Sequence, residues 1–410
     1  MTRPRWLVLL FVAAGVCVLA YLALTVHRRA ERDFAASPGA VRTRIELTQW
    51  DAHGYFASYG LLRPTDDPSV LYRSSTGAYR ITAYLVALAG FDAHAQAVHN
   101  QVVSLLTSVL LALLALRLAL RLGVEPLHAV ALALAAQLVF FTFPENLALY
   151  WDMTAQAYWL VPALAFLLIE ERVVEGRTRR MNVAQALAVF AMTWLEYVCA
   201  TMFLAAYLLA ALFMSDARPP LKRLLLMLGA PWVAAMALFG LQLALAGADP
   251  EVKLVGSRFL YRTGLDGDAE LYGTPLDIAF GRDIVRAQRP AAREQLFRWP
   301  ILFLSGAAAV VLMLIAYVRG KVPRIAVVPL LALLGAYLLY AGLFSQAVAL
   351  HPYLYDLLLA PALVLALFTL LPALAEARTR TGLVTVVTLL AAAWTALFQV
   401  RLYAMAYPLR

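Results

Sequence analysis

The stretch VVSLLTSVLLALLALRLALR, residues 102–121, decides the class of fold. Its side chains are apolar apart from a few hydroxyls, until Arg117 and Arg121 end it. A helix of about 20 mainly apolar residues is long enough to cross a hydrocarbon core of roughly 30 Å. Apolar segments of this kind recur along the chain, which predicts an all-α polytopic membrane protein.

The composition supports the same class. The chain has 410 residues, of which 63% are hydrophobic and 14% charged, whereas a soluble domain is about half apolar and a quarter charged. The net charge of +9 is explained first by membrane topology and anionic lipid headgroups, so we expect membrane lipids and no nucleic acid as partners. Cys17 and Cys199 both lie in apolar segments, which argues against a disulfide framework.

The N-terminal segment MTRPRWLVLLFVAAGVCVLAYLALTV has an apolar run of about 20 residues, longer than the roughly 7–15 of a signal-peptide core. We therefore expect it to be a retained span, the first of about eleven in a single transmembrane domain of residues 1–410. The predicted spans are 6–26, 96–122, 127–143, 150–169, 182–195, 198–214, 221–246, 299–318, 324–346, 354–374 and 382–404.

The connections between spans predict the orientation. EERVVEGRTRRM, SDARPPLKR, RGKVPR and EARTRTG are all basic, and the positive-inside rule places such connections in the cytoplasm. The long loops 27–95 and 247–298 then face the outer side. Arginine is preferred over lysine along the chain, as in GC-rich bacterial genomes, so we expect a bacterial inner membrane with the site facing the periplasm.

Two segments need separate treatment. YRITAYLVALAGF has an apolar run too short for a span, and its apolar side chains recur at helical spacing, so we expect a helix that lies in the membrane interface. The segment 182–214 has basic residues at both ends and is interpreted as a helical hairpin that breaks near Glu196. Burying this acid without a partner would cost several kcal/mol. Glu196 is therefore expected at the outer tip, where it binds a sugar hydroxyl, orients an arginine or simply solvates the turn.

The first outer loop contains TQWDAHGYFASYGLL, residues 48–62, and we expect a short helix over 50–62. Asp51 and Tyr55 would share a face of this helix because they are four residues apart. Its aromatic residues, Trp50, Phe56 and Tyr59, would hold it at headgroup depth. Partial desolvation there raises the basicity of a carboxylate and suits a general base. The alternative is that Asp51 is only an N-cap.

Later in the same loop, YRSSTGAYR brings Arg73 and Arg80 together with hydroxyl side chains. Guanidinium groups and hydroxyls beside a membrane suit the phosphate of a lipid. The alternative for each arginine is that it reaches to the lipid headgroups.

This layout resembles the GT-C superfamily of integral-membrane glycosyltransferases, which includes protein O-mannosyltransferases and aminoarabinose transferases. The resemblance rests on a first span, a large outer loop with an acid in a D-x-x-x-Y setting, interfacial helices and many further spans. It implies a polyprenyl-phosphate-linked sugar donor, inversion at the anomeric carbon and Asp51 as the base. Many members have two adjacent acids, but Ala52 and His53 follow Asp51 here, so His53 becomes the candidate partner.

Other polar residues at the predicted outer face are candidates for the same site. Glu145 and Asp152 flank the turn between two spans and are assigned either to a substrate cleft or to helix caps. His351 and Tyr353 lie at the mouth of a late span. In several GT-C branches a late outer-loop histidine or arginine lies near the donor phosphate, so these two are candidate phosphate ligands.

The loop 247–298 adds Arg258 and Arg262, which share a helical face and are candidate ligands for a pyrophosphate. Asp266 and Asp268 form a D-G-D sequence that suits either a divalent metal or a glycine-rich solvated turn. We expect no metal or other cofactor to be required.

The chain has no Walker loop, Rossmann glycine pattern, HExxH or CxxC motif, so nothing supports nucleotide-driven chemistry. The predicted function is transfer of a hexose or pentose from a polyprenyl-phosphate donor to a lipid or glycan acceptor. The alternatives are a transporter, a flippase of lipid-linked glycans, and a glycan polymerase or ligase. Transporters usually have repeated halves and polar breaks at mid-membrane. Here the polar groups concentrate at one face and the two long loops are unequally placed, which argues against a transporter.

Overall fold

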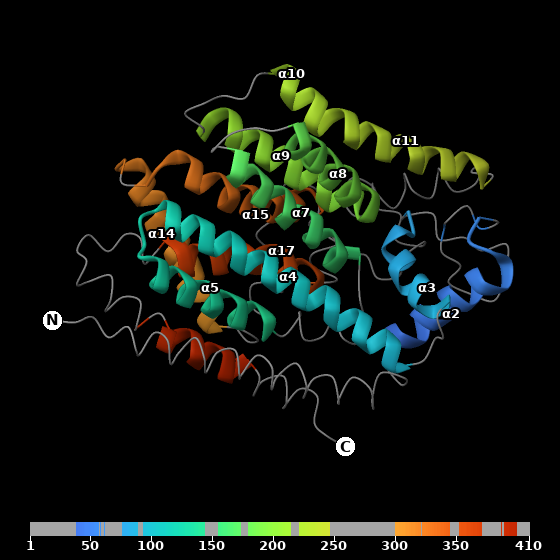
Figure 1. Cartoon of the computed structure of the whole chain (residues 1–410), viewed down its shortest axis with the longest axis horizontal. Helices are drawn as coiled ribbons and strands as arrows, with labels where there is room; N and C mark the ends of the chain where they lie inside the picture. Colours follow the sequence, from blue (N-terminus) through green and yellow to red (C-terminus); the bar gives the residue numbers. More distant parts are fainter. Residues whose placement is uncertain are drawn as a thin grey trace, which may run out of the picture.

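The computed structural model describes residues 38–56, 58, 61, 76–88, 93–143, 155–173, 179–214, 221–246, 300–320, 322–344, 352–370, 387 and 389–399. Within these ranges the regular structure is helical and no strand occurs. Helices lie side by side in a bundle, and two further helices, α2 (Pro38–His53) and α3 (Ile81–Leu88), lie together at one end of it (Figure 1).

The bundle helices coincide within a few residues with predicted spans. They are α4 (Ala93–Arg121), α5 (Pro126–Phe141), α7 (Ala155–Val173), α8 (Arg179–Leu195), α9 (Tyr197–Met214), α10 (Leu221–Leu224) continued by the π-helical turn η3 (Leu225–Gly229) and α11 (Ala230–Leu245), α14 (Pro300–Val318), α15 (Arg324–Leu343), and α17 (Pro352–Leu365) with its π-helical turn η5 (Ala366–Leu370). Residues 389–399 are also helical.

Three described helical segments are long and apolar enough to cross a membrane, namely His99–Arg121, Leu225–Leu245 and Ala326–Leu343. Six further apolar helices are shorter. The chain therefore has the character of a helical membrane protein, as the sequence predicts. The count of eleven spans stays a prediction, and the first span, 6–26, lies outside the described residues.

The structure confirms the helical break in one of the two segments that the sequence set apart from ordinary spans, and the short helix in the other. The placement of the short helix in the membrane interface stays a prediction. The segment 182–214 breaks at Glu196, between α8 and α9. The segment that is too short for a span forms α3, which has only eight residues. Leu85 and Leu88 on α3 are largely exposed, while Ala83 is buried, so α3 presents an apolar surface away from the bundle.

The bundle is held by two sets of helix contacts. On one side α4 packs against α5 and α7, α7 packs against α8, and α8 packs against α11. On the other, α15 packs against α9 and α17. Aromatic side chains join α7 to α9, with edge-to-face contacts of 5.8 Å between Trp159 and Phe203 and 4.9 Å between Phe166 and Tyr207. Such pairs stabilise packing beyond the area they bury.

Two glycines permit close approach between helices. A Cβ atom at Gly335 on α15 would lie 2.7 Å from the Cβ of Ala206 on α9, and one at Gly306 on α14 would lie 2.6 Å from the Cβ of Leu363 on α17. Small residues at such crossings are typical of membrane helices, where close van der Waals packing drives association. These positions therefore fix how near the paired backbones come.

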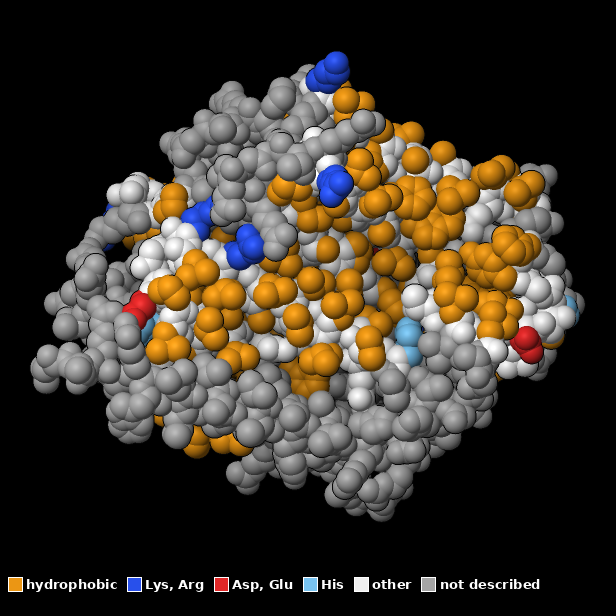
Figure 2. Space-filling view, viewed as in Figure 1, with side chains coloured by type: hydrophobic (Ala, Val, Ile, Leu, Met, Phe, Trp, Pro, Cys, Tyr) orange, Lys and Arg blue, Asp and Glu red, His pale blue; other side chains and the backbone are white. Residues whose placement is uncertain are grey.

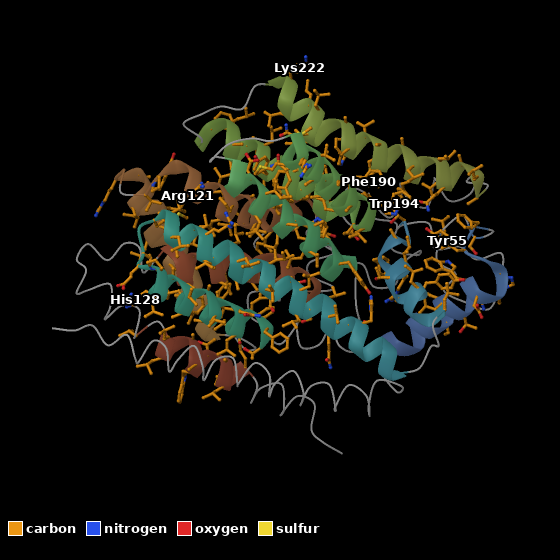
Figure 3. All side chains as sticks on the ribbon, in the orientation of Figure 1. Tyr55, Arg121, His128, Phe190, Trp194 and Lys222 are labelled. Atoms are coloured by element: carbon orange, nitrogen blue, oxygen red, sulfur yellow. The ribbon has the colours of Figure 1, made fainter. Side chains whose placement is uncertain are left out.

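The two ends of the bundle differ in their side chains. Tyr55 and Trp194 lie toward the end that carries α2 and α3, while Arg121 and His128 lie toward the opposite end (Figure 3). Hydrophobic side chains cover most of the described surface of the face in Figure 2, and the Lys and Arg side chains coloured on that face lie away from α2 and α3. We call the end with α2, the 3-10 turn η2 (Ala78–Arg80) and α3 the first-loop end. Its basic counterpart is the end that the sequence assigns to the cytoplasm.

Candidate functional site

The first-loop end begins with α2, whose C-terminal turn carries Asp51. The sequence predicts a helix over 50–62, and this prediction is wrong. The helix begins at Pro38 and ends at His53. Gly54 ends it because its φ of +83° is in the left-handed region, and its N–H donates to the Trp50 carbonyl at 2.8 Å. A glycine in this conformation is a common helix C-terminus. The predicted shared helical face of Asp51 and Tyr55 is therefore wrong.

Trp50 anchors this segment to the protein and not to the membrane interface. The prediction that it floats at headgroup depth is wrong, because its side chain is fully buried. The indole N–H donates to the Leu61 carbonyl at 2.8 Å. Tyr55 and Tyr84 contact the indole edge-to-face, at 4.9 Å and 5.5 Å between ring centroids. Phe56, another aromatic of the predicted set, is 88% exposed, and Tyr59 lies outside the described residues.

A buried ion pair joins α2 to η2. The Nε of Arg80 donates to Oε2 of Glu46 at 2.8 Å, and the two side chains are 3% and 0% exposed. The guanidinium also lies over the Tyr79 ring, 4.9 Å from its centroid. Burial alone lowers the pKa of Arg80, but interactions with Tyr79 and Glu46 outweigh burial and raise the pKa above its ordinary value. Arg80 is therefore a cation held in place by an acid of its own loop.

The end of the first loop is tied to the α8–α9 hairpin. The Thr76 hydroxyl donates to the Trp194 carbonyl, and Gln242 of α11 donates to the Thr76 carbonyl at 3.5 Å. Leu61 packs in a cluster that includes Trp194 and Phe239. The break at Glu196 thus lies at the same end of the bundle as α2, as the sequence predicts.

Glu196 has an identifiable local role. One carboxylate oxygen accepts a hydrogen bond from the Val198 N–H at 3.3 Å, and the Glu196 carbonyl accepts one from Ala200 at 3.0 Å. Glu196 is therefore the N-cap of α9, which satisfies one of the unpaired N–H groups at the start of that helix. Capping was not among the roles that the sequence predicted for Glu196, and binding of a sugar hydroxyl, orientation of an arginine and solvation of the turn remain predictions.

The two predicted catalytic residues, Asp51 and His53, are both exposed on the last turn of α2. Asp51 is not at the N-terminus of this helix, so the N-cap alternative is wrong. A carboxylate near a helix C-terminus faces the negative end of the helix dipole, which destabilises the helix by about 0.3–1 kcal/mol. Local helix stability therefore does not explain an acid here. Nearby, partial burial raises the pKa of Tyr55.

Of the remaining candidates, only Tyr353 lies among the described residues. Tyr353 is in the first turn of α17. Arg73, Glu145, Asp152, Arg258, Arg262, His351, Asp266 and Asp268 lie outside the described residues, so their predicted roles are untested. Among the side chains that are described, no group of three or more His, Cys, Asp or Glu is placed to hold a metal ion.

Sequence reasoning missed the residues that support Arg80 and its surroundings. Glu46 lies five residues before Asp51, and His99 and Tyr158 lie within predicted spans. His99 contacts Tyr158, with 5.8 Å between ring centroids, and Tyr158 in turn contacts Tyr79 at 6.2 Å. The available signal was a histidine followed by asparagine near the start of an apolar helix, because polar groups at such depth are costly unless they are paired.

Comparison with protein-family models, with curated proteins and with solved structures finds no match to this chain.

Proposed function

We propose that this protein is a membrane glycosyltransferase that transfers a hexose or pentose from a polyprenyl-phosphate donor to a lipid or glycan acceptor on the outer side of the membrane. One observation carries the proposal. The first loop folds over one end of an apolar bundle and collects acidic, basic and hydroxyl side chains there, including Glu46, Asp51 and Arg80. Ionisable groups at the edge of a membrane domain are a default pointer to function.

The proposed reaction is a single inverting displacement. The acceptor hydroxyl oxygen forms a bond to the anomeric carbon, and the bond from that carbon to the phosphate oxygen breaks. Asp51 takes the proton of the acceptor hydroxyl, with His53 as its candidate partner. The polyprenyl phosphate leaves with the bonding electron pair. Because a phosphate monoester is a good leaving group, no acid catalyst is needed.

The phosphate of the donor requires cationic or hydrogen-bonding partners, which stabilise the charge that builds on the leaving oxygen. Arg73, Arg258, Arg262, His351 and Tyr353 are the proposed partners. Arg80 was proposed for the same role. It is paired with Glu46, so its contribution is to position the loop unless a phosphate replaces that carboxylate.

The test uses purified full-length protein in liposomes with labelled polyprenyl-phosphate hexoses and pentoses, and a membrane lipid extract as acceptor. Loss of a general base typically lowers a rate by about 100-fold or more, which is the expected effect of Asp51→Asn. Thr48→Ala, an exposed change on the same helix, serves as the matched control. Equal rates for Asp51→Asn and wild type would remove Asp51 from the mechanism.

The rival functions give different outcomes in the same liposomes. A transporter or flippase would move the labelled lipid between leaflets without any change in its bonds. A polymerase or ligase would transfer a whole glycan and not a single sugar. Movement without bond change by the wild-type protein would refute the glycosyltransferase proposal.

A further inference from the structure

Polar side chains from three elements meet beside the buried ion pair. His99 of α4 lies between Thr82 of α3 and Tyr158 of α7: its Nε2 is 2.9 Å from the Thr82 hydroxyl, and its Nδ1 is 3.5 Å from the Tyr158 hydroxyl. Thr82, His99 and Tyr158 form what we call the hydroxyl cluster. The three positions are far apart in sequence, so only the fold brings them together.

The direction of the hydrogen bonds follows from the groups involved. Nδ1 of His99 is 3.2 Å from Oδ1 of Asn100, an amide oxygen that only accepts. Nδ1 therefore carries the proton in this contact, and Nε2 accepts from the Thr82 hydroxyl. A second group holding one ring nitrogen fixes both the tautomer and the orientation of an imidazole. The cluster thus offers a directed acceptor at Nε2 beside a hydroxyl that can donate or accept.

The support beneath the cluster is buried and electrically paired. Tyr158 is buried, and its ring packs against both His99 and Tyr79. The guanidinium of Arg80 lies against the Tyr79 ring and forms an ion pair with Glu46. A matched ion pair neither attracts nor repels a neutral ligand strongly. The cluster therefore suits an uncharged hydroxyl compound better than an anion.

The cluster reaches the surface next to an apolar strip. Tyr158 is buried, His99 is partly exposed and Thr82 is exposed. On α3, the helix that carries Thr82, the side chains of Leu85 and Leu88 are each 60% exposed. A surface that offers hydrogen-bonding groups beside exposed leucines fits a sugar that is carried on a lipid.

We propose that Thr82, His99 and Tyr158 form a binding site for the hydroxyl groups of a neutral, lipid-linked sugar. When the sugar binds, one of its hydroxyls replaces the hydrogen bond between Thr82 and Nε2 of His99. The ligand hydroxyl then donates to Nε2 and accepts from the Thr82 hydroxyl, while Tyr158 and Asn100 hold the imidazole in place. As a substrate site, this inference rests on the proposed glycosyltransferase function. The sugar belongs either to the donor or to the acceptor, and the two are separated below.

The first experiment tests binding without any transfer. Diethyl pyrocarbonate acylates unprotonated imidazole nitrogens, and mass spectrometry locates the modified histidine. The full-length protein is held in polyoxyethylene micelles, and octyl glucoside, galactoside, mannoside and xyloside are added in turn. At least one glycoside is expected to slow the modification of His99 about threefold or more, which corresponds to an occupancy of about two-thirds or more, because only the free site reacts. An octyl polyoxyethylene of equal chain length is expected to have no such effect.

Lys222 on α10 is the internal control because it is exposed, lies away from the first-loop end (Figure 3) and carries an amine that diethyl pyrocarbonate also acylates. Its modification rate should not change. Thr82→Val should abolish the protection of His99, while Thr48→Val on the exposed face of α2 should leave it intact. The site is refuted if His99 does not react, if no glycoside slows its modification, or if Lys222 is slowed to the same degree.

The second experiment identifies the source of the sugar. In the transfer assay, Thr82→Val and His99→Gln are expected to raise one KM about tenfold and to change kcat by less than about threefold. A raised KM for the polyprenyl-phosphate sugar assigns the site to the donor, and a raised KM for the extract assigns it to the acceptor. Unchanged KM values refute the substrate site alone. If wild-type protein transfers no sugar, the proposed function fails, while the protection experiment still decides whether a sugar binds.

Discussion

The buried ion pair between Glu46 and Arg80 gives the sharpest prediction about this structure. Glu46→Gln removes one charge and preserves the size of the side chain. It removes the carboxylate that lies 2.8 Å from the guanidinium of Arg80, a side chain that is only 3% exposed. Breaking a buried pair in this way costs about 3–5 kcal/mol because the remaining charge is desolvated and uncompensated. That is a large part of a typical total stability of about 5–15 kcal/mol.

The expected effect is both global and local. The free energy of unfolding in mixed micelles should fall by about 3–5 kcal/mol, and protease cleavage between α2 and η2 should become faster. The double variant Glu46→Gln with Arg80→Met should recover most of the loss, because replacing both partners of a buried pair is often neutral. Thr48→Ala, exposed on α2, should have little effect on either measurement.

The result that would refute this reasoning is specific. If the free energy of unfolding of Glu46→Gln is within about 1 kcal/mol of the wild-type value, Arg80 is solvated and the ion pair does not stabilise the first loop. If the double variant is no more stable than the single one, the loss comes from packing at position 46 and not from an unpaired charge.

Three further predictions concern two glycines and the side chain that caps α9. Gly335→Ala should destabilise the contact between α15 and α9 by about 1–3 kcal/mol relative to Gly342→Ala, because only the first places a Cβ 2.7 Å from that of Ala206; thermal unfolding measures this, and an equal melting temperature for the two variants contradicts it. Gly54→Ala should cost about 1–2 kcal/mol, because φ is +83° there; no loss on chemical unfolding would mean that α2 ends differently. Glu196→Ala should cost about 0.5–2 kcal/mol by removing the N-cap of α9, whereas Glu196→Gln keeps an acceptor for Val198; similar unfolding curves for the two variants would argue against capping.

The sequence located the bundle helices well because apolar length and charged connections report directly on membrane insertion. It was less successful in the first loop. Helix periodicity around Asp51 is compatible with a helix on either side of it, and the aromatic residues are compatible with either burial or an interface. In the structure the helix lies mostly before Asp51 and ends at His53, because Gly54 adopts a left-handed conformation and because the Trp50 indole donates to the buried Leu61 carbonyl.

The supporting residues of the site were beyond sequence reasoning for a different reason. Glu46 and Arg80 are 34 positions apart, and His99 and Tyr158 are 59 apart. Nothing in their spacing indicates contact, since each pair forms only when separate helices pack. A single sequence carries hydrophobic periodicity and charge, but not the partner of an individual polar group.

The amino-acid sequence by itself determined that this chain is a helical membrane protein, where its helices lie and that Glu196 interrupts one of its apolar segments, because local hydropathy controls each of these. Only the tertiary structure decided that Arg80 is paired with Glu46, that Trp50 is buried and that Thr82, His99 and Tyr158 meet. Those contacts depend on how α2, η2 and α3 fold over the end of α4 and α7, and packing between distant segments leaves no periodic trace in the sequence.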